Sequence, residues 1–345
     1  MSQTGAASER QSTRPALLLE RDRELGVLED LVAGAVSGRA ATVVVEGAAG
    51  IGKSRVLVAA RGAAKARGVR VLTARAGELE RELPFGVVRQ LFEPLMEEDD
   101  WFAGAGAAAR AVVSPPAVAG PVEESFAALH GLYWLTANVA ADRPLMLAID
   151  DLQWSDRTSL RFLAYLVRRV EGLPILVAAT LRSGEAAADP ALLGEVLGDP
   201  LTTMVSLRAL SPAGVAELVR ARLGDDAEPA FCATCHEATG GNPLLVCQLI
   251  SALAAEAIEP RAANAAAVQR LGPRAVSRTV LLRLARLPED VRRVARAVAI
   301  LGDGADVTTV AALVELDAAF VAEASGALAR ADILRPDAPL AFVHA

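Results

Sequence analysis

The segment VVVEGAAGIGKS at residues 43–54 constrains this chain more than any other part of it. An apolar, β-branched run leads directly into the pattern G-x-x-x-x-G-K-S, and a run able to form a helix follows at 55–67. Glycines at 47, 50 and 52 let the backbone curl so that its N–H groups point at phosphate oxygens. The positive end of the following helix strengthens this anion site. The sequence therefore predicts a phosphate-binding loop for a nucleoside triphosphate with Mg²⁺.

The loop residues have separate expected roles. Lys53 would reach the β- and γ-phosphates, and the Ser54 hydroxyl would coordinate Mg²⁺. A glycine-rich turn that binds nothing is the alternative, which the strand before and the helix after disfavour. The expected nucleotide-binding set in the loop is Gly47, Ala48, Ala49, Gly50, Ile51, Gly52, Lys53, Ser54 and Arg55.

Two carboxylates follow a second apolar run, LMLAIDD at 145–151. A continuous apolar run is typical of a buried parallel strand. Asp150 is placed to hold Mg²⁺ through water, and Asp151 to orient or deprotonate the attacking water. An acidic turn without a function is the alternative, which the phosphate loop in the same chain makes less attractive.

A third apolar run, at 175–179, ends in Thr180-Leu181-Arg182. Ligands of open parallel sheets bind at the carboxyl ends of the strands. Thr180 and Arg182 are therefore expected to face the γ-phosphate, where Arg182 would report hydrolysis by losing a charge partner. A surface arginine after a strand remains the alternative for Arg182. Trp154 is either a reporter beside the metal site or a core aromatic.

Apolar periodicity divides the chain into four parts. Residues 1–15 are small and polar and indicate a disordered tail, and residues 16–208 form an α/β core. The α/β fold class is a parallel sheet covered by helices, as in P-loop NTPases, with predicted strands at 42–46, 69–74, 145–149, 175–180 and 203–207. The segment 104–121 is expected to be a loop or a weak helix.

An all-helical lid is expected at 209–260, followed by a winged-helix-like module at 261–345 that is incomplete. A Pro/Ala/Arg stretch near 259–266 indicates a linker between them. The module is expected to contain helices near 276–286, 288–301, 307–314 and 318–331 and a hairpin at 333–343.

Composition excludes several function classes. Charged residues make up 22% of the chain and its net charge is −7, so no basic field attracts nucleic acid. No apolar run reaches the roughly 18–20 residues of a membrane span, and the N-terminus lacks the pattern of a signal peptide. Three cysteines do not indicate a disulfide framework. We expect a cytoplasmic protein with no membrane partner.

Cys232, Cys235 and His236 satisfy the haem-attachment pattern C-x-x-C-H. Attachment of haem would require export, and a zinc site would lack a fourth ligand nearby. The segment lies on a predicted helix, so the cysteines are interpreted as small core residues.

Taken in order, five motifs resemble the N-terminal ATPase region of large LuxR-type transcriptional regulators. These belong to the STAND class of AAA-like ATPases, which have an Orc1-like ATPase domain. The resemblance runs from residue 17 onward and rests on LLLERDREL at 17–25, ELERELPFGVVRQLF at 78–92, DDLQWSD at 150–156, TLR at 180–182 and GGNPLL at 240–245. It implies that Arg21 and Pro243 lie near the adenine. The class usually has Gly where this chain has Glu20.

The resemblance also implies a switch with weak, slow ATPase activity. ADP would hold the lid and winged helix closed, whereas ATP would open them and permit self-association. The family continues for hundreds of residues beyond this C-terminus, so we expect a truncated regulator or a short stand-alone ATPase, without DNA binding by these residues. A P-loop NTPase or kinase acting on a separate substrate, or a module that binds ATP without hydrolysing it, remains open.

Overall fold

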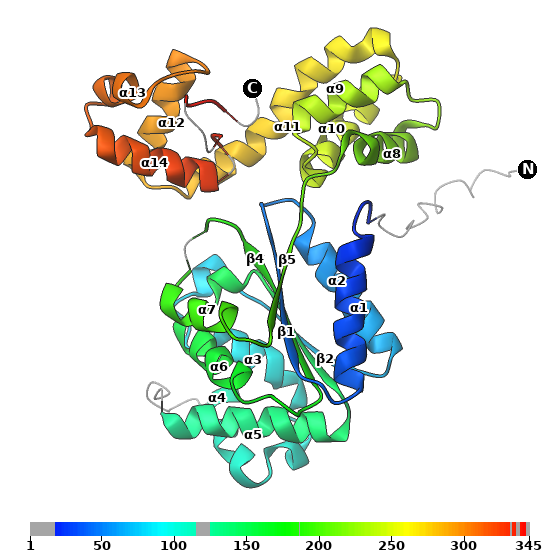
Figure 1. Cartoon of the computed structure of the whole chain (residues 1–345), viewed down its shortest axis with the longest axis vertical. Helices are drawn as coiled ribbons and strands as arrows, with labels where there is room; N and C mark the ends of the chain where they lie inside the picture. Colours follow the sequence, from blue (N-terminus) through cyan, green and yellow to red (C-terminus); the bar gives the residue numbers. More distant parts are fainter. Residues whose placement is uncertain (1–17, 115–124, 186, 332, 336–338, 343–345) are drawn as a thin grey trace, which may run out of the picture.

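Five parallel strands form the centre of the N-terminal part of the chain (Figure 1). This computed structural model describes residues 18–114, 125–185, 187–331, 333–335 and 339–342. The strands are β1 (Ala41–Gly47), β2 (Arg70–Arg75), β3 (Leu145–Asp150), β4 (Ile175–Arg182) and β5 (Thr202–Ser206). Their order is β2-β3-β4-β1-β5, which puts the strand before the phosphate loop inside the sheet. The predicted fold class is confirmed, and every predicted strand lies within two residues of an observed one.

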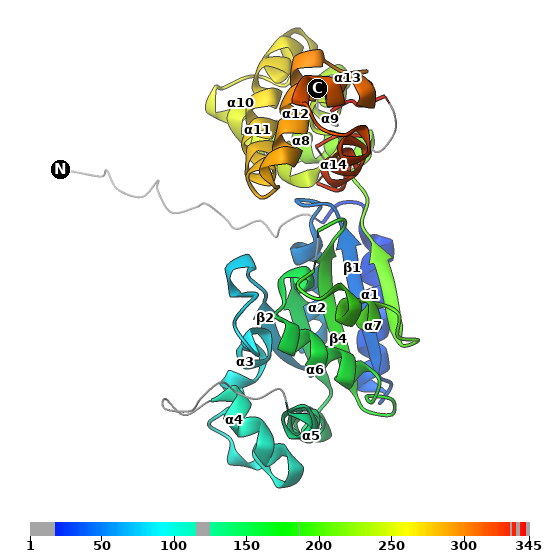
Figure 2. The ribbon, with the colours of Figure 1, turned by 90° about the vertical axis from the view of Figure 1, so that its left-hand side faces the viewer.

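Helices cover both faces of this sheet because the side chains of each strand alternate between them (Figures 1 and 2). Val43 and Val45 pack in one apolar cluster, whereas Val44 packs in the cluster on the opposite face. The first face carries α1 (Asp22–Val36) and α2 (Lys53–Ala66). The second carries α3 (Gly86–Phe92), α5 (Phe126–Asp142), α6 (Arg157–Val167) and α7 (Pro190–Leu197). Burial on both sides explains why the inner strands β1, β3 and β4 are apolar along most of their length.

Short helical turns fill the connections of the core. They are η1 (Glu78–Glu80), η2 (Glu93–Leu95), η3 (Asp99–Phe102), η4 (Gly104–Ala109), α4 (Arg110–Val113) and η5 (Leu152–Trp154). The segment expected as a loop or weak helix at 104–121 thus begins with η4 and α4, and its residues 115–121 lie outside the described residues.

The helices expected to form the lid, called the lid below, begin at α8 (Pro212–Leu223), where Ser211 accepts a hydrogen bond from the Gly214 N–H as the helix cap. The lid continues with α9 (Pro229–Thr239) and α10 (Pro243–Ala255). These helices bury a cluster around Phe231 that also includes Val268 and Leu271 from α11 (Ala265–Ala285).

Helix α11 differs from the expected linker and boundary. We predicted a linker at 259–266 and a helix only from 276, but after η6 (Ala262–Asn264) one continuous helix begins at Ala265. Its first half completes the lid cluster, while Val280 and Leu284 pack against the C-terminal cluster. Apolar residues at both ends of α11 therefore join the two parts through a helix rather than through a flexible linker (Figure 1).

The C-terminal module contains α12 (Glu289–Leu301), α13 (Val307–Val314) and α14 (Ala318–Arg330). Antiparallel bridges join Ala305 to Leu340 and Leu334 to Phe342, in the region of the expected hairpin. Residues 336–338 and 343 of that hairpin lie outside the described residues. Ile333, Leu334 and Leu340 pack against the three helices, which gives the module its own core.

Cys232 and Cys235 lie inside the lid cluster. Burial, reinforced by the neighbouring Cys232, raises the pKa of the Cys235 thiol to about 12. Burial also raises the pKa of Cys232. Both thiols are therefore protonated packing groups at neutral pH. Over the part of the chain that the structure describes, every helix is too short or too polar to cross a membrane.

Gly241 generates a prediction about the stability of the lid. It has a positive φ of 70°, and a Cβ at this position would overlap the carbonyl oxygen of Leu210. We expect Gly241→Ala to lower the free energy of unfolding by about 2–4 kcal/mol, because the backbone strain of a positive φ adds to the overlap with the Leu210 carbonyl oxygen. Gly302→Ala is the matched control, since Gly302 has a φ of 82° but open space around its Cβ position, and should lose only about 1 kcal/mol. Urea denaturation followed by circular dichroism measures both, and equal losses would contradict the overlap argument.

Candidate nucleotide site

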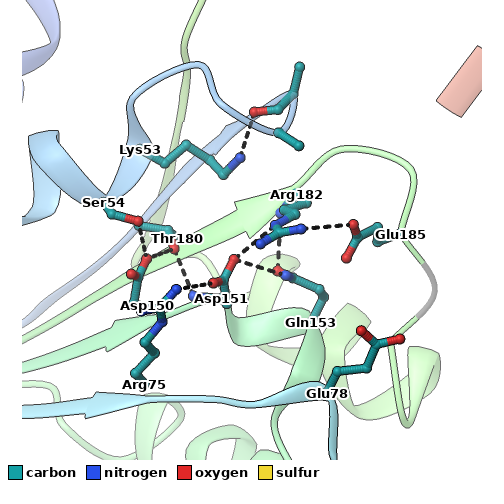
Figure 3. A network of polar contacts seen from close by, with 12 residues as sticks. Lys53, Ser54, Arg75, Glu78, Asp150, Asp151, Gln153, Thr180, Arg182 and Glu185 are labelled. Carbon is teal, nitrogen blue, oxygen red and sulfur yellow. Dashed lines mark hydrogen bonds and ion pairs between the residues drawn. The ribbon is translucent and has the colours of Figure 1, made fainter. Parts of the chain in front are cut away.

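The site lies where the carboxyl ends of β1, β3 and β4 meet (Figure 3). Parallel pairing sets Val45 beside Thr180 and Ile149 beside Ala179, so the residues that follow each strand gather at one edge. The structure thus brings together Lys53 and Ser54 from the loop, Asp150 and Asp151 from the end of β3, and Thr180 and Arg182 from the end of β4.

Asp150 is the centre of a hydroxyl and carboxylate cluster. Its Oδ1 accepts a hydrogen bond of 2.9 Å from Ser54 Oγ and one of 2.6 Å from Thr180 Oγ1. The Thr180 hydroxyl in turn accepts from the Asp151 backbone N–H at 2.8 Å, so its own proton is directed toward Asp150. One carboxylate beside one hydroxyl suits Mg²⁺, which usually takes few protein ligands and completes its shell with water and phosphate oxygens. Within the described residues no group of three or more His, Cys, Asp or Glu side chains could hold a metal by itself.

Lys53 is buried and its amine lies within the loop. Its Nζ donates to the carbonyl oxygens of Gly47, at 2.6 Å, and Ala48, at 2.8 Å. Loss of solvation, followed by the positive charge of Arg182, lowers the pKa of Lys53 to about 8, although nearby carboxylates oppose the shift. Additional negative charge at this position would stabilise the protonated amine, as a phosphate does in other loops of this kind.

The lid rests directly on the phosphate loop. The Leu244 N–H donates to the Gly50 carbonyl at 3.2 Å, and Asn242 Nδ2 donates to the Ala49 carbonyl at 3.0 Å. Gly50 has a φ of 83°, and a Cβ there would lie 2.8 Å from Asn242 Oδ1. Glycine at this position therefore serves both the turn of the loop and the close approach of α10.

Asp151 has an unfavourable backbone conformation, and both oxygens of its carboxylate have partners. Its φ is 59°, in the left-handed region, and its side chain is buried. Oδ1 accepts from Gln153 Nε2 at 3.1 Å and from Arg182 Nε at 3.0 Å, while Arg75 forms an ion pair with Oδ2 at 3.9 Å. These partners hold the carboxylate toward the edge of the sheet.

Arg182 is largely buried, with a side chain that is 17% exposed, so it is not a surface arginine. Besides Asp151 it pairs with Glu185 at 3.1 Å, and its guanidinium lies 4.1 Å from the centre of the Trp154 ring. Trp154 is itself buried. The indole is thus a core aromatic and also a direct neighbour of the predicted sensor.

A small cavity lies on the other side of the loop, between the core and the lid. Its volume of about 40 Å³ has room for only a few waters, so a nucleotide base would require the lid to move. Arg21, Arg55 and Pro243, which the sequence predicts to contact the nucleotide, all line it. The complete lining is Leu18, Leu19, Arg21, Ile51, Gly52, Arg55, Leu210, Leu218, Pro243 and Cys247.

Arg21 ties the loop to the connection that leads into the lid. Its guanidinium donates to the carbonyl oxygens of Ile51, at 3.3 Å, and Arg208, at 2.7 Å. The preceding Glu20 has a φ of 54°, a conformation that glycine adopts without strain. The Glu20 carboxylate accepts from both the hydroxyl and the N–H of Ser211, and these bonds lower its pKa. This contact with the start of α8 offsets the strain that a non-glycine residue has here.

Sequence reasoning missed four polar residues of the site. Gln153 connects the Asp151 carboxylate to the Arg182 N–H, and Asn242 connects the lid to the loop. Both residues lie inside sequence motifs named above, and their polar side chains could have identified them as residues of the site. Arg75 is the last residue of β2 and could have been found by its place at a strand end. Arg283, which donates to the Ala49 carbonyl at 2.9 Å, follows no local pattern.

Comparisons with known proteins agree with this geometry. The family model described as AAA ATPase domain matches residues 17–178. A Walker-type ATPase of Pyrococcus abyssi is 13% identical, with a TM-score of 0.60 over 94% of this chain and 93% of that one. The Orc1 protein of Aeropyrum pernix, solved in complex with DNA, is 17% identical, with a TM-score of 0.50 over 93% and 86%. A STAND protein with a tetratricopeptide repeat sensor from Pyrococcus horikoshii is 18% identical, with a TM-score of 0.45 over 96% and 42%.

None of the curated proteins matches the chain. At these identities the two structures with higher TM-scores show the fold alone. The family match over residues 17–178, with the phosphate loop and the strand-end acids, makes the N-terminal part of the chain similar to a P-loop AAA-type ATPase module.

The lowered pKa of Lys53 predicts the pH dependence of nucleotide affinity. Bound phosphate favours the protonated Lys53 amine. Below about pH 8 the amine of the free protein is already protonated, so nucleotide affinity should not change with pH. Above about pH 8 the free amine is neutral, and nucleotide binding must take up a proton. Affinity should then fall by up to about tenfold per pH unit. Titration with a labelled nucleotide from pH 6.5 to 9.5 measures this, with Lys53→Arg as a control that does not titrate in the range. Parallel curves for the parent and Lys53→Arg would contradict the assignment to Lys53.

Proposed function

We propose that this chain is an ATP-operated regulatory switch that hydrolyses ATP slowly. The observation that carries the proposal is that helices outside the core rest on the phosphate loop itself. Asn242 and Leu244 of the lid and Arg283 of α11 all bond to carbonyls of Ala49 or Gly50. A phosphate that reorganises this loop would change the surface that holds the lid, so ligand and conformation are coupled.

Hydrolysis would use groups that already lie together. Lys53 would exchange the loop carbonyls for phosphate oxygens, and Ser54 and Asp150 would hold Mg²⁺, which neutralises phosphate charge when bound. Thr180 would orient Asp150, and Asp151 would position the attacking water and accept its proton. Arg182 would turn from Asp151 toward phosphate charge.

The same contacts support slow turnover. Asp151 is paired with Arg182 at 3.0 Å and lies near Arg75, so its oxygens already have partners and are not free to accept a proton from water. Its activity as a base would depend on the departure of Arg182. Hydrolysis would therefore be timed by an arginine movement rather than by the encounter with water.

The biological setting that we propose is the ATPase module of a LuxR-type transcriptional regulator of the STAND class. Support comes from the order of the five motifs between residues 17 and 245. In this setting the ADP form is closed, the ATP form is open and self-associates, and the protein acts in the cytoplasm. A stand-alone NTPase or kinase is the competing function, which turnover measurements distinguish.

Two substitutions separate binding from chemistry. Lys53→Ala should lower ATP affinity by about 100-fold or more, because a charged contact to the phosphates is lost. Asp151→Asn should keep affinity within about threefold of the parent and lower kcat by about 10²–10⁴-fold. Nucleotide titration and single-turnover hydrolysis measure the two effects. Unchanged affinity in Lys53→Ala would remove the phosphate-loop assignment, and unchanged turnover in Asp151→Asn would remove the base.

The nucleotide that copurifies with the chain tests the switch. We expect denaturation of the purified protein to release ADP close to one equivalent, because a closed lid slows its escape. Chromatography of the released nucleotide gives the answer. Bound ATP would favour a non-hydrolysing module, whereas an empty protein with fast turnover would favour the stand-alone NTPase or kinase.

A further inference from the structure

The C-terminal module contacts the core at three places that do not involve the lid. Arg283 bonds to the Ala49 carbonyl of the phosphate loop, and Arg286 Nε pairs with Glu78 Oε2 at 3.3 Å. At the third place Gly184, with a φ of 79°, allows Arg330 to approach so closely that a Cβ at position 184 would overlap the Arg330 Cα and Cβ. These contacts surround a cavity of about 290 Å³ whose wall includes Arg182 and Trp154.

Trp154 lies between arginines that belong to different parts of the chain. The guanidinium of Arg182, at the end of β4, lies 4.1 Å from the centre of the indole ring. The guanidinium of Arg286, which follows α11, lies 5.2 Å from the same centre. Both distances are inside the roughly 6 Å range of cation–π attraction, and the ring is almost entirely screened from water. The indole is therefore a shared partner of the predicted sensor and of the C-terminal module.

On the core, Arg286 also contacts a segment that has no role in the proposed hydrolysis. Glu78 lies in η1, at the start of the segment ELERELPFGVVRQLF. Its carboxylate pairs with Arg286, so that the arginine has one partner on η1 and another on η5. Within its own module, Arg286 follows directly on α11, which packs against α12–α14 through Val280 and Leu284. A displacement of Arg286 would therefore move α11 and the helices α12–α14 that pack against it.

Arg182 has competing partners, and this makes the contact sensitive to charge. It pairs with the carboxylates of Asp151 and Glu185 while it covers Trp154. A γ-phosphate beside Lys53 adds negative charge that draws the guanidinium away from the ring. With Arg182 displaced, the indole can shift, and its contact with Arg286 changes with it.

We propose that Trp154 couples Arg182 to Arg286, so that the nucleotide bound in the core sets how firmly the C-terminal module is held. The inference rests on the proposed switch and names the residues that transmit it. In the ADP form, Arg182 covers Trp154, and Arg286 stays fixed between Glu78 and the ring. In the ATP form, Arg182 turns to the phosphate and the module is released.

Hydrogen exchange of the full chain tests this coupling. In the parent, amides of α12 should exchange about 2–30-fold faster with a non-hydrolysable ATP analogue than with ADP, the range expected for one to two cation–π contacts. In Arg286→Leu, exchange should be fast and nearly equal with both nucleotides. Arg270→Leu is the matched control, because Arg270 lies on the same helix and pairs with Glu256 at 2.7 Å, away from the ring.

Changes at the ring itself complete the test. Trp154→Leu should remove the nucleotide dependence of α12 exchange, whereas Trp154→Phe, which keeps a ring, should retain part of it. The coupling is overturned if Arg286→Leu and Trp154→Leu respond to the nucleotide as the parent does, and the switch then still stands. If the parent binds both nucleotides but exchanges equally with each, the proposed switch fails and the coupling fails with it.

Discussion

The parallel pairing of β1, β3 and β4 is the constraint on which the rest of the site depends. Ser54 lies 96 residues before Asp150, and Thr180 lies 30 residues after it, yet two hydrogen bonds join them on a single carboxylate oxygen. This is possible because the register aligns Val45 with Thr180 and Ile149 with Ala179. A slip of one residue would turn these side chains to the opposite face of the sheet and dissolve the cluster.

Around this cluster, positive and negative side chains lie close together, with Lys53, Asp151 and Arg182 largely buried and Arg75 exposed. Lys53, Arg75 and Arg182 lie close to Asp150, Asp151 and Glu185, and the lysine is satisfied by carbonyls of its own loop (Figure 3). A buried charge without a partner is costly, so Lys53, Asp151 and Arg182 each need a substitute partner before they can leave the present one. A nucleotide phosphate would supply that substitute for the cations, and the released carboxylate could then act in chemistry. Binding and activation are thereby linked through the same side chains.

Helix α11 extends this link beyond the core. Its first half belongs to the lid cluster and its second half to the C-terminal cluster, so neither part can move without affecting the other. Arg283 also anchors its end to the phosphate loop. A flexible linker at 259–266 would have isolated the C-terminal module from the site, whereas a packed helix makes the two mechanically continuous.

The sequence by itself determined the α/β class, the five strands and the residues that gather at their carboxyl ends. These follow from local signals: apolar runs of strand length, glycines in the loop, and polar residues placed directly after each strand. Tertiary structure alone decided the partners of those residues. Arg182 covering Trp154, Glu20 bonding to Ser211, and Arg283 reaching Ala49 join segments that no spacing rule connects. It also decided that α11 is continuous, because its apolar residues become a helix face only when two separate clusters are present to bury it.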